Sequence, residues 1–216
     1  MRIGCSFPTS SSHDRRINKT CSSNACVVQI IQNESRHLIY CLPQLLASAS
    51  YDDTVKLYRE EEDDWVCCAT LEGHTSTVWS LAFDQSGEQL ATCSDDKTLR
   101  IWRQIKAEEE QGGSKKDPSW KCVCTLTGYH TRTVYDVSWN HLTGSLASAC
   151  GDDAIRIFEE DAGSDPMQPN FSLTAHMPRA HAQDVNCVAW HPKEPGLLAS
   201  CSDDGDMAFW QYQRPE

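Results

Sequence analysis

The chain has 216 residues, a formal net charge of −12 and a hydrophobic content of 39%, so it is long enough for a globular domain with its own core. The excess of acidic residues argues against nucleic acid as a partner, because phosphate binding needs a basic face. No apolar run approaches the ~20 residues of a membrane span, and the N-terminal region shows no signal-peptide core. These features predict a cytoplasmic protein, with the nucleus as an additional location, and no membrane partner.

Twelve cysteines raise two alternatives, a disulfide framework and metal sites. No two of them form the C-x-x-C pair typical of zinc sites, and most stand in alternating apolar runs such as 65–71 and 120–126. Without a secretion signal, we expect reduced cysteines that pack as small hydrophobic residues. We therefore predict no metal ion and no cofactor.

Residues 1–40 differ in composition from the rest of the chain. They are rich in Ser and Thr, hold five basic and two acidic residues, and show no sustained apolar period. This composition predicts a poorly ordered extension, with one short strand near residues 27–31. A mitochondrial presequence would also be rich in Arg and Ser, but it would show an apolar stripe that this segment lacks.

Beyond residue 41 the sequence repeats itself. The string LLASASYDDTVKLY at 45–58 returns in similar form at 89–102, 145–158 and 197–210. Three of the four copies are preceded by a histidine that stands four residues before a valine. A period of this length, with G-H near its start and an aromatic residue after S-x-D, is the WD40 signature. Each unit reads as four short strands, which make one propeller blade.

The repeats predict an all-β WD40 propeller with four blades over residues 41–216. The blade boundaries lie at about 42–72, 73–128, 129–180 and 181–216. Long insertions at 103–119 and 159–170 fall between the third and fourth strands and explain the uneven spacing. Propellers protect their strand edges by circular closure, so we expect an open or incomplete ring of four blades to be less stable than a closed one.

The recurring His, Ser or Thr, and Asp look at first like catalytic triads. A hydrolase needs one exposed nucleophile beside an oxyanion site, not three copies on separate blades. In WD40 proteins, which these repeats resemble, the same positions form a hydrogen-bond network that satisfies buried polar groups. We therefore predict no catalytic residue and no small-molecule substrate. The predicted network residues are Ser48, Asp52, His74, Thr92, Asp96, Trp102, His130, Ser148, Asp152, His181, Ser200, Asp204 and Trp210.

Two repeats depart from this pattern. Phe158 replaces the tryptophan in the third repeat, so Ser148 lacks an indole donor there. The first repeat has Tyr58 at that position and no matching histidine upstream, which makes it the weakest unit.

Two faces of the propeller are candidate partner surfaces, and the sequence does not select between them: the long insertions lie on one, and the candidate contact residues lie on the other, which we call the contact face. It carries the starts of the first strands and the tight turns, and exposed aromatic residues mixed with acids suit peptide binding. The alternative is that its large aromatic residues pack between blades. The candidate contact residues are Tyr51, Trp79, Asp95, Tyr135, Asn186 and Asp203.

The amino-acid sequence of the repeats, including their loops, closely resembles that of one family, the cytosolic iron–sulfur assembly WD40 proteins. The likeness runs over about 42–216 and is carried by segments 45–74, 117–139, 151–161 and 191–216. The resemblance implies a non-enzymatic adaptor that helps deliver 4Fe–4S clusters to cytosolic and nuclear apo-proteins. Its implied partners are these clients and the subunits of an iron–sulfur targeting complex. The family has seven blades, so the chain resembles its last four and lacks the first three.

The tripeptide Leu57-Tyr58-Arg59 matches the L-Y-R motif that iron–sulfur co-chaperones recognise. Leu57 and Tyr58 are also predicted strand residues, so core packing is the alternative. For the whole chain, two other functions remain open. One is a general WD40 scaffold such as a ubiquitin-ligase substrate receptor, which the fold by itself supports as well as it supports the iron–sulfur role. The other is a shortened chain with no independent activity.

Overall fold

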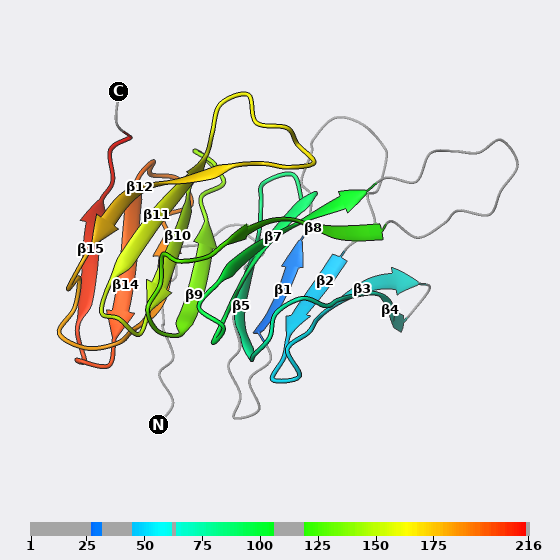
Figure 1. The fold of residues 1–216 in the computed structure, drawn as a ribbon, viewed down its shortest axis with the longest axis horizontal. Helices are drawn as coiled ribbons and strands as arrows, with labels where there is room; N and C mark the ends of the chain where they lie inside the picture. The colour runs from blue at the N-terminus through cyan, green and yellow to red at the C-terminus, as the bar shows by residue number, and fades with distance from the viewer. Residues whose placement is uncertain (1–26, 32–44, 62–63, 106–118, 215–216) are drawn as a thin grey trace, which may run out of the picture.

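The structure is a computed structural model that describes residues 27–31, 45–61, 64–105 and 119–214. Within these ranges the chain forms 15 strands and no helix (Figure 1). The strands make four antiparallel sheets, each built from strands that follow one another in the chain. We call these sheets blades 1 to 4. They lie one after another in an open arc, which confirms the prediction of an all-β fold with four blades and no closed ring.

Blade 1 begins within residues 1–40, the segment whose composition differs from the rest of the chain. Its strands are β1 (Val27–Ile31), β2 (Leu45–Ala49), β3 (Val55–Glu61) and β4 (Asp64–Leu71). The predicted short strand is β1, and it pairs with β2 from Val27 opposite Ala49 to Ile31 opposite Leu45. The first blade therefore starts earlier than the predicted boundary near residue 42. Four β-branched residues out of five favour a strand at this place, and without it β2 would be an uncovered edge. The rest of the predicted extension lies outside the described residues.

Blades 2 and 3 are complete four-stranded sheets. Blade 2 contains β5 (Val78–Phe83), β6 (Gln89–Ser94), β7 (Leu99–Ile105) and β8 (Ser119–Leu126). Blade 3 contains β9 (Val134–Trp139), β10 (Leu146–Cys150), β11 (Ile155–Glu160) and β12 (Phe171–Met177). The two insertions connect third and fourth strands, as the spacing predicted.

Blade 4 has three strands in the described part of the chain: β13 (Val185–Trp190), β14 (Leu197–Ser202) and β15 (Met207–Gln211). The tight turn between the second and third strand recurs in all four blades. In each turn one residue has a positive φ, and these residues are Asp53, Lys97, Asp153 and Gly205. Aspartate and glycine tolerate this conformation better than most residues.

The innermost strands β1, β5, β9 and β13 contact one another in that order, so the blades are stacked around a common side. Three apolar clusters fill the junctions between blades 1 and 2, 2 and 3, and 3 and 4. The core is therefore divided into interblade layers. Blade 1 and blade 4 lie at opposite ends of the arc (Figure 1).

Candidate protein-interaction site

The predicted polar network is continuous in blade 2. The Nδ1 atom of His74 lies 2.8 Å from Asp96 Oδ2, and its Nε2 atom lies 2.7 Å from the Thr92 hydroxyl. The Trp102 indole donates to the same hydroxyl at 2.9 Å. The network therefore ties the segment before β5 to β6, to β7 and to the turn between them through buried groups.

Blade 4 repeats this geometry. His181 lies 3.1 Å from Asp204 and 2.7 Å from the Ser200 hydroxyl. The Trp210 indole donates to Ser200 at 2.9 Å. In both blades the histidine and the hydroxyl are buried, so they are not placed as a nucleophile and base that a substrate could reach.

Blade 3 differs from the predicted network. His130 Nε2 lies 2.8 Å from the Ser148 hydroxyl, but its Nδ1 atom has no hydrogen-bond partner among the described residues. Asp152 instead accepts two hydrogen bonds from the Arg156 guanidinium, at 2.8 and 2.9 Å. The sequence-based expectation that Asp152 holds His130 is therefore wrong for this blade, because a neighbouring arginine supplies a stronger, bidentate partner. Phe158 offers no indole donor to Ser148.

Blade 1 holds the least of the network. Asp52 accepts from the backbone N–H and the hydroxyl of Thr54 at 3.1 and 2.7 Å, so it stabilises only its own turn. Ser48 is half-buried on β2, and no hydrogen bond of its side chain is found within the described part of the chain.

The aspartates of the networks are stabilised as carboxylates. Burial raises the pKa of Asp96, but the hydrogen bonds from His74 and Thr98 outweigh it and hold this pKa well below its ordinary value. For Asp152 the Arg156 hydrogen bonds likewise overcome burial and lower the pKa. Burial and the Arg156 charge lower the pKa of His130 to about 4. These groups are therefore fixed in charge near neutral pH, as structural groups rather than proton carriers.

The predicted contact face contains a row of three aromatic side chains from three blades. The Trp79 ring, at the start of β5, lies between Tyr51 of blade 1 and Tyr135 of blade 3. The ring centroids are 5.5 and 5.7 Å apart and the contacts are edge-to-face. Tyr51 is 53% exposed, whereas the other two are half-buried. The aromatic row packs across blades and also reaches the surface at Tyr51, and its role as a partner contact stays a prediction.

Acidic side chains anchor the aromatic row. Asp95 accepts from the Trp79 indole at 2.9 Å and from the Thr133 hydroxyl at 2.7 Å, so it links blades 2 and 3. The Tyr135 hydroxyl donates to Asp184 of blade 4 at 3.2 Å. These bonds limit the motion of the rings before any partner arrives, which lowers the entropic cost of binding.

Two residues of this face were not identified from the sequence. Asp184 binds Tyr135 and also the exposed Arg132, whose Nη1 atom lies 3.0 Å from its carboxylate. The signal was their place in the repeat, since Arg132 stands two residues and Asp184 one residue before the valine that opens the next strand. Asn186 and Asp203 form a separate contact on blade 4, where the amide donates to the carboxylate at 2.5 Å.

The Leu57-Tyr58-Arg59 tripeptide lies on β3. Leu57 is fully buried in the cluster between blades 1 and 2, Tyr58 is half-buried, and Arg59 is paired with Glu61. A partner that reads all three side chains would therefore have to displace part of blade 1.

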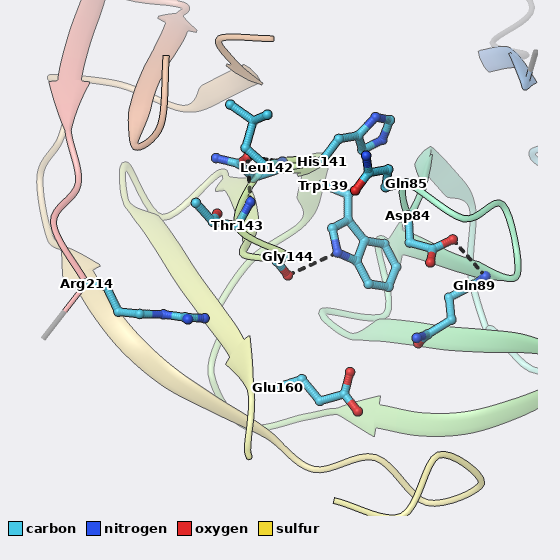
Figure 2. A pocket seen from close by; sticks show the side chains of 11 residues that line it. Asp84, Gln85, Gln89, Trp139, His141, Leu142, Thr143, Gly144, Glu160 and Arg214 are labelled. Carbon is cyan, nitrogen blue, oxygen red and sulfur yellow. Dashed lines mark hydrogen bonds between the residues drawn. The ribbon is translucent and has the colours of Figure 1, made fainter. Parts of the chain in front are cut away.

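A pocket of about 330 Å³ lies at the other end of the strands, between the β5–β6 and β9–β10 turns (Figure 2). The Trp139 ring forms its wall, and the Trp139 indole donates to the Gly144 carbonyl at 3.0 Å. Two side chains that could serve chemistry are engaged elsewhere: Thr143 with Ser145, and His141 with the Phe83 carbonyl. The lining therefore shows no nucleophile paired with a base.

The cysteines of the described residues are all free thiols. Burial raises the pKa of Cys150 to about 11 and also raises that of Cys124, so neither is activated as a nucleophile. In the described ranges no three His, Cys, Asp or Glu side chains gather in a way that could hold a metal ion. Nor does any described segment form a helix able to cross a membrane.

Comparison with known sequences agrees with the repeat pattern. The family profile described as "WD domain, G-beta repeat" (WD40) matches residues 65–103, 120–159 and 168–211, which together exceed half of the chain. These matches cover blades 2, 3 and 4 and the outer strand of blade 1.

The chain is also similar to curated proteins named "Probable cytosolic iron-sulfur protein assembly protein CIAO1". It is 84% identical to the Xenopus tropicalis protein over 114 residues, which are 53% of this chain and 34% of that protein. It is 72% identical to the mouse protein over 165 residues and 73% identical to the human protein over 166 residues. In both of the latter the match covers 76% of this chain and 49% of the relative. The chain thus spans about half the length of these mammalian relatives.

Proposed function

Because this chain belongs to the WD40 repeat family, we propose that it is a non-enzymatic adaptor in cytosolic iron–sulfur protein assembly, which helps deliver 4Fe–4S clusters to apo-proteins. The observation that carries the proposal is the identity of 72–73% to mouse and human proteins whose names state this assembly role. Its partners would be subunits of the iron–sulfur targeting complex and apo-protein clients, in the cytoplasm and the nucleus. Nucleic acids, membranes and small-molecule substrates are not proposed as ligands.

The aromatic row of Tyr51, Trp79 and Tyr135 is the proposed contact surface for these partners. Aromatic side chains carry much of the binding energy at interfaces when a partner covers them. The rings are held in place by Asp95 and Asp184. The charge of Asp184 is paired with Arg132, whereas Asp95 and Asp203 form no ion pair with a described residue and give the face a negative charge. We propose that this face takes a partner segment that combines apolar and basic side chains.

The test is affinity purification of the 216-residue chain from cells, with partners identified by mass spectrometry. We expect the iron–sulfur targeting subunits to be recovered with the unmodified chain. Replacement of the most exposed ring, in a Tyr51→Ser variant, should lower this recovery at least about tenfold, as loss of an interface hot spot does. The matched control is Leu142→Ser, which removes a side chain of similar exposure (49%) from the end of the blades that holds the pocket.

Two results would contradict the proposal. Equal recovery with Tyr51→Ser and the unmodified chain would exclude the aromatic row as the contact surface. Recovery of a cullin adaptor in place of the iron–sulfur subunits would indicate a ubiquitin-ligase receptor, and recovery of chaperones alone would indicate a chain without adaptor activity.

A further inference from the structure

The pocket of Figure 2 lies at the end of the strands opposite to the aromatic row, and the proposed function does not use it. Its lining comes from the β5–β6 turn of blade 2, from the β9–β10 turn and the end of β11 in blade 3, and from the segment after β15. In Figure 2 the Glu160 carboxylate and the Gln89 amide lie on the same side of the Trp139 ring. A carboxylate, an amide and an aromatic ring therefore line one cavity.

The lining carries negative charge that no described residue neutralises. Asp84 and Glu160 line the pocket, and neither forms an ion pair within the described part of the chain. Arg214 is the one arginine or lysine among the described lining residues. Its Nε atom donates at 2.7 Å to Glu159, which is not a lining residue. The charge of Arg214 is thus paired outside the cavity, and the cavity favours a cation over an anion.

Several hydrogen-bonding atoms of the lining also lack partners. Glu160 accepts from the Ser164 hydroxyl at 2.8 Å through Oε1, and no described residue donates to its Oε2 atom. Gln89 Oε1 and Asn140 Nδ2 are buried without a hydrogen-bond partner among the described residues, and Asn140 is only 1% exposed. Because Asn140 Oδ1 accepts from two backbone N–H groups of its own turn, its Nδ2 atom is assigned as the free donor. Buried polar groups are normally paired, so these atoms mark a place for polar groups that the described chain does not supply.

We propose that this pocket binds an arginine side chain of a partner protein. A guanidinium has several N–H donors in one plane, so it can donate to Glu160 and to Gln89 at the same time. The methylene stem of the arginine would pack on the Trp139 ring and on Leu142, which is 49% exposed. Asn140 Nδ2 would donate to a backbone carbonyl oxygen of the same partner segment.

The mixture of acceptors and one donor selects among cationic ligands. A free polyamine offers only donors, so it would leave the Asn140 amide unpaired. A lysine side chain carries a compact ammonium group, which matches two separate acceptors less well than a planar guanidinium does. The pocket and the aromatic row lie at opposite ends of the strands, so we expect different proteins to occupy them independently. Failure of one site would therefore not affect the other.

The test is titration of the ¹⁵N-labelled 216-residue chain with three peptides of the form acetyl-Gly-Ser-X-Ser-Gly-amide. The central residue X is arginine, lysine or citrulline, which keeps the shape of arginine without its charge. NMR spectra follow the indole N–H signal of Trp139, which is assigned by its loss in a Trp139→Phe variant. We expect saturable shifts with the arginine peptide, binding at least about tenfold weaker with the lysine peptide, and no saturable shift with the citrulline peptide.

A matched pair of variants locates the binding. Glu160→Gln removes the carboxylate charge but keeps the side-chain shape, and it should weaken binding of the arginine peptide at least about tenfold. Glu194→Gln makes the same change at an exposed glutamate of the β13–β14 turn, which does not line the pocket. This control should bind the arginine peptide like the unmodified chain. Circular dichroism checks that both variants keep their strand content.

Three results would overturn the proposal. One is the absence of any effect of the arginine peptide on the Trp139 signal. Another is an equal effect of the arginine and citrulline peptides, because the guanidinium charge would then play no part. The third is an equal loss of binding in Glu160→Gln and Glu194→Gln. That result would assign the attraction to the overall charge of −12 and not to the pocket.

Discussion

Blades 2 and 3 carry histidine, hydroxyl, aspartate and arginine at equivalent positions, yet they pair these side chains differently. In blade 2 His74 connects Thr92 and Asp96. In blade 3 Asp152 pairs with Arg156, and His130 keeps a bond only to Ser148. The same repeat motif therefore supports two polar arrangements in neighbouring blades.

The residue before each histidine explains the difference. A side chain at Gly73 would lie 3.0 Å from Arg100 Nη1 and 3.2 Å from the Trp102 ring, so glycine leaves the space that this guanidinium occupies in blade 2. Tyr129 stands at that position in blade 3, and its ring packs on Phe158 with centroids 5.1 Å apart. We infer that the tyrosine takes the space on that side, so that the Arg156 guanidinium turns to Asp152. The two blades thus differ at the glycine position of the G-H motif itself, which is Gly73 in blade 2 and Tyr129 in blade 3.

The largest effect is expected from removal of the ion pair between Arg156 and Asp152. Arg156→Met leaves the poorly exposed Asp152 carboxylate without its main partner, so we expect the free energy of unfolding to fall by about 3 kcal/mol. Arg100→Met is the matched control, because the one side-chain hydrogen bond of Arg100 among the described residues is a weak one, from Nη1 to the Cys122 thiol at 3.7 Å. It should cost about 1 kcal/mol or less, mainly from packing of the side-chain stem. Urea unfolding measures both, and equal losses would show that the two arginines have the same role.

The next effect compares the two histidines. His74→Ala removes a hydrogen bond to a carboxylate and one to a hydroxyl, whereas among the side chains of the described residues His130 bonds to the Ser148 hydroxyl and to no carboxylate. Because both changes leave a similar cavity, we expect His74→Ala to lower the free energy of unfolding by about 2 kcal/mol more. Thermal and urea unfolding of the two variants provide the measurement. An equal or larger loss for His130→Ala would show that the bond between His74 and Asp96 adds no stability beyond what His130 supplies.

The smallest expected effect is the pH dependence that His130 of blade 3 adds to the free energy of unfolding. The pKa of His130 is about 4 in the folded chain, below the ordinary value of about 6.5. The folded state therefore disfavours the protonated ring, whose charged neighbours are Arg156, Asp152 and His176. This neutral histidine contributes its full stability above pH 6.5, and the contribution is lost as the pH falls toward 4.

Between pH 7 and 5 we expect the free energy of unfolding to fall by about 1–2 kcal/mol through this group. The lowered pKa values of Asp96 and Asp152 act in the same direction only near and below their ordinary value, so they do not obscure this window. A His130→Gln variant keeps a polar side chain without a titrating ring and should show a shallower slope over the same range. An unchanged slope would assign the pH dependence to other groups.

The repeat strings by themselves determined the order and length of the strands. Strand identity depends on local alternation of apolar and polar residues, and turn residues stand at fixed offsets between the alternating runs. The positions of His74, Thr92, Asp96 and Trp102 could be predicted for the same reason, because spacing along paired strands places them side by side.

Only the tertiary structure decided the features that depend on space between segments far apart in the sequence. The choice of Arg156 over His130 as the partner of Asp152 depends on how these side chains pack in space, which the shared motif does not specify. The addition of β1 to blade 1 depends on an edge that another segment must cover. The exposure of Met207 and Phe209 could not be read from β15, because the same positions of β3, β7 and β11 hold apolar residues that are buried. Whether a strand residue is buried depends on the segment that packs against it, and the strand's own sequence does not specify that segment.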